Sequence, residues 1–124
     1  MRAAYLVGRF LLGGFFLYNG INHFKEREQL AQYAGSKGIQ PADTAVVGSG
    51  TLLVASGMSL MLGAKPALGA LGVIAFLLGV SPQMHDFWNV QDPQQRQSEM
   101  INFSKNMALA AAALALLGAE AGRE

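Results

Sequence analysis

The stretch that decides the fold runs from Thr44 to His85 and reads TAVVGSGTLLVASGMSLMLGAKPALGALGVIAFLLGVSPQMH. Lys65 is its only charged residue before Asp86, and it divides the stretch into apolar runs of 21 and 20 residues. A bilayer core of about 30 Å is spanned by about 20 helical residues, so each run is long enough for one transmembrane helix. Neither run carries the polar stripe that a helix on the surface of a soluble protein needs. The stretch therefore predicts a helical hairpin that crosses a membrane twice.

Two further apolar runs lie on either side of this hairpin. Phe10–Phe24 and Asn106–Ala119 contain no charged residue, and Arg9 and Lys105 extend them toward the ends of their helices. A cation near a helix end can reach the lipid headgroups. It thereby avoids the cost of about 2.5–3.5 kcal/mol for placing a charged side chain at the centre of the membrane. We predict one all-α membrane domain over residues 1–124, an antiparallel four-helix transmembrane bundle with helices at about 3–24, 44–63, 66–85 and 101–119. None of the four uncharged runs contains an aspartate or a glutamate.

The composition of the 124 residues excludes several classes of protein. Charged residues make up 14% of the chain, against about 25% in soluble domains, and a net charge of +1 leaves no basic surface for nucleic acid. With no cysteine, the chain has no thiolate metal site and no thiol nucleophile. The 15 glycines fall mainly inside the predicted spans, where small residues let helices pack closely. We expect the first span to be retained, because no small-x-small cleavage site follows it.

The predicted topology gathers polar residues at one end of the bundle. Because the link around Lys65 is short, the helices alternate in direction, and the polar connections Lys25–Asp43 and Asp86–Met100 lie on the same membrane face. In the first connection we expect a short helix at 26–34, ended by Gly35 and lying on the membrane surface over the polar end. In the second we expect less order. The predicted site at this end comprises Asn19, Asn22, His23, His85, Trp88, Asn102, Lys105 and Asn106.

Two interpretations of this cluster stay open. Such residues commonly end transmembrane helices as interfacial anchors. They could instead form a pocket for a lipid headgroup, a quinone carbonyl or a partner subunit, with His23 or His85 handling protons. Two histidines without a ligand-spacing motif do not predict a metal site. Arg9, near the opposite end, is expected to reach the lipid headgroups, by snorkelling or in contact with an anionic lipid.

The basic residues barely distinguish the two membrane faces. Four lie on the side of the termini and five on the other side, namely Arg2, Arg9, Lys65 and Arg123 against Lys25, Arg27, Lys37, Arg96 and Lys105. The first helix and the short link favour termini in the cytoplasm.

Four motifs of the chain resemble those of the DoxX-like family of small bacterial membrane proteins. They are GRFLLGGFFLYNGINHF (Gly8–Phe24), GMSLMLG (Gly57–Gly63), MHDFW (Met84–Trp88) and NFSKNMALAAAALALLG (Asn102–Gly118). The resemblance covers nearly the whole chain and implies a four-helix protein of the bacterial inner membrane. Some relatives are subunits of redox systems, including a thiosulfate:quinone oxidoreductase. Many relatives carry a glutamate in the middle of the second helix, where this chain offers Thr51 as the most polar residue.

These observations favour an accessory or structural subunit of a membrane complex, respiratory or quinone-linked, with no catalytic activity of its own. The expected partners are membrane lipids and either other membrane subunits or further copies of the chain. Quinone is the one cofactor suggested. A quinone-binding oxidoreductase component is the first alternative. A small transporter is the second, although no span has the Gly or Pro break near its midplane, flanked by charges, that would favour transport.

Overall fold

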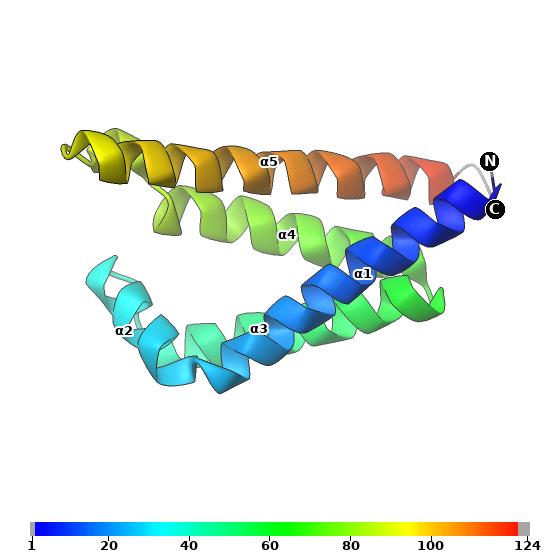
Figure 1. Ribbon diagram of the computed structural model, residues 1–124. Coiled ribbons are helices and arrows are strands. Elements are labelled where there is room, and N and C mark those ends of the chain that lie inside the picture. The colour runs from blue at the N-terminus through cyan, green and yellow to red at the C-terminus, as the bar shows by residue number, and fades with distance from the viewer. Residues whose placement is uncertain (1, 122–124) are drawn as a thin grey trace.

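The computed structural model describes residues 2–121 as a bundle of four long helices with two short helical segments at one end (Figure 1). The long helices are α1 (Arg2–Lys25), α3 (Ala42–Leu62), α4 (Pro66–Met84) and α5 (Pro93–Ala121). The short segments are α2 (Arg27–Ser36) and the 3-10 turn η1 (Phe87–Asn89). The start of α1 and the end of α5 meet at the termini end of the bundle, and α2, η1 and the start of α5 form the opposite, loop end.

All four long helices are long and apolar enough to cross a membrane. They alternate in direction along the chain, with α1 and α4 running from the termini end to the loop end and α3 and α5 running back (Figure 1). The predicted all-α antiparallel four-helix bundle is therefore confirmed, and the protein is a multi-pass membrane protein.

The last helix starts earlier than the expected residue 101. Asp92 caps its first turn, because its Oδ2 accepts a hydrogen bond of 3.0 Å from the backbone N–H of Gln95. Pro93 occupies the first helical position, where its missing N–H costs nothing. The helix therefore has 29 residues and, at 1.5 Å per residue, exceeds the roughly 30 Å of a bilayer core. The expectation of less order in the connection Asp86–Met100 is therefore wrong for residues 93–100, which are helical.

The first connection contains the expected short helix, although α2 ends later than Gly35. The helix continues to Ser36, and the N–H of Lys37 still reaches the carbonyls of Tyr33 and Ala34. The left-handed turn is taken by Gly38, at φ 82°, which is the conformation that favours glycine. The two residues that follow Ala34 therefore belong to the helix and not to the turn.

Glycines bring α1 and α3 into close contact. A Cβ atom placed on Gly57 would lie 2.6 Å from the backbone nitrogen of Leu17 and 2.7 Å from the carbonyl oxygen of Gly13. One placed on Gly20 would lie 2.8 Å from the nitrogen of Val54. Because real Cβ atoms do not approach backbone atoms so closely, these positions require glycine, as expected for helices packed through small residues. Gly48 and Gly79 meet nothing within 4 Å and do not contribute to this packing.

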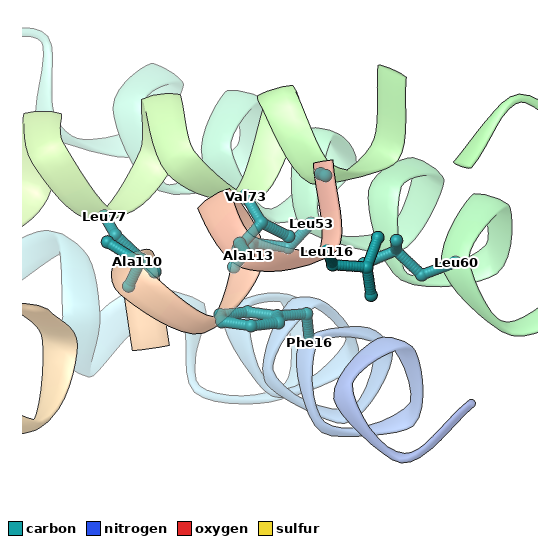
Figure 2. Close-up of a cluster of buried hydrophobic side chains, with 9 residues drawn as sticks. Phe16, Leu53, Leu60, Val73, Leu77, Ala110, Ala113 and Leu116 are labelled. Atoms are coloured by element: carbon teal, nitrogen blue, oxygen red, sulfur yellow. The ribbon is translucent and has the colours of Figure 1, made fainter. Parts of the chain in front are cut away.

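The core lies at the middle of the bundle, where all four long helices contribute side chains (Figure 2). Phe16 of α1 lies beside the fully buried Leu53 and Leu60 of α3 and Val73 of α4. On the α5 side the core is closed by the small side chains of Ala110 and Ala113. Many large apolar side chains point outward instead, for example Leu11, Leu62 and Leu114, which are each more than 60% exposed. Such an outward surface suits lipid, which solvates apolar side chains.

Candidate functional site

The loop end carries most of the polar contacts between elements. The end of α1, helix α2, the end of α4, η1 and the start of α5 all lie there (Figure 1). We call the charged and phenolic side chains that bridge these elements the polar cap. They are Arg27, Tyr33, Lys37, Asp43, His85, Asp86 and Glu99.

Helix α2 is fastened over this end by three contacts. The Tyr33 hydroxyl donates a hydrogen bond of 2.9 Å to the carbonyl of Met84, at the end of α4. Lys37 Nζ lies 2.7 Å from Asp86 Oδ1, which joins the segment after α2 to the segment after α4. Arg27 pairs with Asp43 through two hydrogen bonds, at 2.7 and 3.1 Å, at the first turn of α3. These contacts hold α2 over the loop end of the bundle, as predicted from the sequence, so α2 forms a lid on this end.

The charges around Lys37 and Tyr33 favour the protonated side chains, which make the contacts that hold α2 in place. The carboxylate of Asp86 accepts a hydrogen bond from Lys37 and so raises the pKa of that amine. Partial burial raises the pKa of the Tyr33 phenol, and the negative charge of Glu99 adds to the effect. Both groups therefore keep their protons, and with them their hydrogen bonds, over the whole neutral range of pH.

His85 makes the contact that joins α4 to α5 at this end. Its Nδ1 lies 2.8 Å from Glu99 Oε2, and the Glu99 side chain is only 14% exposed. Because a carboxylate only accepts, Nδ1 of His85 must carry the hydrogen in this contact. One turn below His85, the hydroxyl of Ser81 is fully buried and has no hydrogen-bond partner within residues 2–121. The next residue, Pro82, cannot donate to the helix, and the side chain of Gln83 donates to the carbonyl of Gly79 at 3.0 Å.

His23 occupies a different environment from His85. Its Nδ1 donates to the carbonyl of Asn19 at 2.8 Å, and its ring lies edge-on to Phe76, with the ring centres 5.8 Å apart. It lines a cavity of about 80 Å³ together with residues of α2, α3 and α4, including Ala34 and Met84. Within the described part of the chain, His23 and His85 share no hydrogen bond or ring contact. The topology thus brings both histidines to one end of the bundle but into separate contacts.

The remaining predicted site residues lie at the same end, but they differ in their contacts and in their exposure. Trp88, which is 49% exposed, packs edge-on against Phe87 and Phe103, with ring centres 5.2 and 5.7 Å away. The Asn19 side chain donates to the carbonyl of Phe15, one turn back on its own helix. Three more amides are half-buried and one lysine is exposed, namely Asn22, Asn102, Asn106 and Lys105. Among residues 2–121, no three histidine or acidic side chains gather closely enough to hold a metal ion.

Sequence reasoning did not find Glu99, Lys37 or Tyr33. Glu99 lies in the connection predicted as a loop, because the uncharged run predicts the last helix from residue 101, whereas α5 begins at Pro93. The Asp92-Pro93 pair was the signal, since aspartate favours the N-cap and proline the first helical position. For Lys37 and Tyr33 there was no local signal, because their partners lie some 50 residues along the chain, at Asp86 and Met84.

At the termini end, the structure places Arg9 inside the bundle. Its Nη1 lies 3.9 Å from Glu120 Oε1, and its side chain is 15% exposed. The guanidinium lies against Gly63, the residue that ends α3 with φ 73°, and 5.7 Å from the ring centre of Tyr5. This position suits a cation, because the last carbonyls of a helix carry a partial negative charge. Arg9 thus contacts α3 and α5. The sequence predicted only that its side chain reaches the lipid headgroups, and gave it no contact within the bundle.

Comparison with known proteins gives one match. A family model described as DoxX matches residues 4–86, which is more than half of the chain. Neither the curated proteins nor the solved structures contain a match. The matched region covers α1 to α4 and both histidines, and it ends before α5 and Glu99.

Proposed function

Since this chain belongs to the DoxX family, we propose that it serves as an accessory subunit of a membrane complex, respiratory or quinone-linked, without catalytic activity of its own. The observation that carries the proposal is the mutual pairing within the polar cap. Arg27 with Asp43, Lys37 with Asp86, and His85 with Glu99 each join two different elements. These contacts hold the elements of the loop end together, which supports a structural role for the polar cap.

A surface for a partner subunit is available beside the cap. The first turns of α5 carry a shallow hollow of about 290 Å³, lined by Gln94, Gln97, Ser98, Ile101 and Asn102. Amide and hydroxyl groups can both donate and accept hydrogen bonds, so this neutral surface can adapt to the polar rim of another protein. Because α5 is longer than the bilayer core is thick, the hollow extends to the membrane surface.

Purification from native membranes in a mild detergent tests this proposal. The tagged chain is expected to elute together with at least one other membrane protein, and elution as a lone 13.1 kDa species would contradict it. A double variant, Gln94→Ala with Gln97→Ala, should reduce the amount of partner recovered. The matched control is Gln29→Ala with Gln32→Ala, on the exposed face of α2, which should leave recovery unchanged.

A quinone-binding role is the second candidate, and the His85 contact favours it. A histidine held by a carboxylate can pass a proton, and Phe103 lies one helical turn from Glu99 and beside Trp88. Aromatic rings at headgroup level can stack on a quinone ring. Extraction of quinone from the purified protein tests this role. Unchanged quinone content in a double variant, His23→Ala with His85→Ala, would rule it out.

The bacterial inner membrane, with both termini in the cytoplasm, is the location that we propose on the strength of the family and the short link at Lys65. A reporter that is active only in the cytoplasm, fused after Glu124, tests the orientation. It should be active, and activity of a periplasm-specific reporter at the same position would reverse the assignment.

A further inference from the structure

The hairpin formed by α3 and α4 carries a groove of about 300 Å³ near its link, at the termini end of the bundle (Figure 1). Leu52 and Ala55 of α3 and Leu68 of α4 line the groove, and all three residues are exposed on membrane-spanning helices. The volume lies at the lower end of the roughly 300–1,000 Å³ typical of ligand sites. The groove therefore opens toward the lipid and offers an apolar wall to an acyl chain.

Lys65 gives this groove a positive charge. It is the one charged residue among the described residues that line the groove, and its exposed side chain makes no ion pair within residues 2–121. It directly precedes Pro66, where α4 begins without a side-chain cap, so the positive end of this helix adds to the charge of the amine. The negative end of α3, at Gly63, is contacted by Arg9. The groove therefore favours an anion and offers no carboxylate to a cationic group.

A buried hydroxyl lies deeper in the same groove. Ser56 is only 5% exposed, and its hydroxyl makes no hydrogen bond within the described part of the chain. Its neighbour Ser59 already donates to the carbonyls of Ala64 and Lys65, at 2.7 and 3.0 Å. At 1.5 Å per residue, Ser56 lies about 4.5 Å closer to the middle of the membrane than Ser59 and the Lys65 carbonyl. Because a hydroxyl in an apolar environment costs free energy unless it is bonded, Ser56 is a donor for a ligand oxygen at this depth.

We propose that this groove binds one anionic diacyl phospholipid. The phosphate pairs with Lys65, an ester carbonyl accepts a hydrogen bond from Ser56, and an acyl chain lies along the apolar wall. The headgroup layer of a bilayer is roughly 5–7 Å thick on each side, so the ester carbonyls lie below the phosphate by about the step from Lys65 to Ser56. The charges decide the lipid class, because the ammonium of a zwitterionic lipid finds no acidic side chain in the groove.

Lipid retention measured by native mass spectrometry tests the proposal. The full chain is reconstituted in bilayers with equal amounts of phosphatidylglycerol and phosphatidylethanolamine, extracted in mild detergent and analysed for bound lipid. We expect phosphatidylglycerol in about fivefold excess over phosphatidylethanolamine, which is the effect of one lysine on an anionic headgroup. Equal retention of the two lipids would overturn the proposal.

Replacing the lysine tests the charge of the groove. Lys65→Gln should abolish the preference for phosphatidylglycerol, because the amide carries no charge. Lys25→Gln is the matched control, since this lysine is also exposed but lies at the loop end of α1 and should leave the preference unchanged. If Lys65→Gln kept the wild-type preference, the anion would be bound elsewhere and the proposal would be wrong.

Two variants test the position of the acyl chains and the ester. Ser56→Ala removes the donor, so it should lower the retention of both lipids about fivefold and keep their ratio, because both lipids carry the ester. Ala55→Leu fills the groove and should also lower the retention of both lipids. Its matched control is Ala111→Leu, at an exposed position of α5 that does not line the groove. Wild-type retention in both Ser56→Ala and Ala55→Leu would show that Lys65 attracts anionic headgroups only at the surface, which contradicts a lipid seated in the groove.

Discussion

Replacing Gly57 with alanine should separate the two most closely packed helices. The new Cβ would lie 2.6 Å from the backbone nitrogen of Leu17 and 2.7 Å from the carbonyl oxygen of Gly13, against about 3.5–4.0 Å for carbon contacts at their optimum. Both atoms belong to the backbone of α1, so no side-chain rotation relieves the clash. The helices must therefore move apart by about 1 Å, and the dispersion contacts along their shared face weaken.

The expected cost is about 1–3 kcal/mol of unfolding free energy, the range for overpacking in a closely packed interior. Gly48→Ala in the same helix is the matched control, because its Cβ would meet nothing within 4 Å. It should be neutral or stabilising, by up to about 1 kcal/mol, through the better helix propensity of alanine. Reversible unfolding of the purified protein in mixed detergent, followed by circular dichroism, measures both variants.

A double variant tests the geometry more strictly. Gly13 and Gly57 face each other, so the first alanine that separates the helices also makes room for the second. The cost of Gly13→Ala combined with Gly57→Ala should fall short of the sum of the single costs by about 0.5 kcal/mol or more. If Gly57→Ala and Gly48→Ala had the same stability, or if the two costs at Gly13 and Gly57 added fully, the proposed packing of α1 on α3 would be refuted.

Three further predictions concern the polar cap. Glu99→Gln replaces the partner of the mostly buried His85 contact and should lower the unfolding free energy by about 1–2 kcal/mol, whereas the exposed Glu28→Gln should not change it. Tyr33→Phe removes the hydrogen bond to Met84 and should cost about 1 kcal/mol and speed proteolysis at the two ends of α2, after Arg27 and Lys37, which limited trypsin digestion followed by mass spectrometry would detect. The raised pKa of Lys37 means that its contribution is complete below the ordinary value of 10.5 and is lost as the pH rises through the higher, folded-state pKa; unfolding measured from pH 8 to pH 11.5 should therefore show a loss of stability at alkaline pH that is smaller in Lys37→Met.

The spans could be predicted from the sequence because their signal is local. The run from Thr44 to Ala64 is longer than the bilayer requires and lacks charge, which leaves a membrane helix as its stable state whatever surrounds it. The start of α5 was missed, although its signal was also local, because the polar residues after Asp92 suggested a loop. Polar composition does not prevent helix formation outside the bilayer, where water solvates the side chains and Asp92 caps the first turn.

The sequence predicted which helix ends meet at the candidate site, but not the contacts that its side chains make. Alternating helices bring the end of α1, the end of α4 and the start of α5 to one face, so His23 and His85 both had to lie at the loop end. Their contacts did not follow from this topology. His85 contacts Glu99 and His23 contacts the backbone of Asn19, because the rotation of each helix about its axis sets the direction of its side chains.

The sequence by itself determined that the chain crosses a membrane four times, which helix ends share a face, and that glycines line the spans. These properties follow from the transfer of each apolar run into lipid, and that free energy depends on the residues of the run alone. Only the tertiary structure decided which charges pair, with Arg9 next to Glu120 and Lys37 next to Asp86. Such pairs depend on how far each helix is rotated and tilted, and close backbone packing at glycines such as Gly57 sets that geometry across distant parts of the chain.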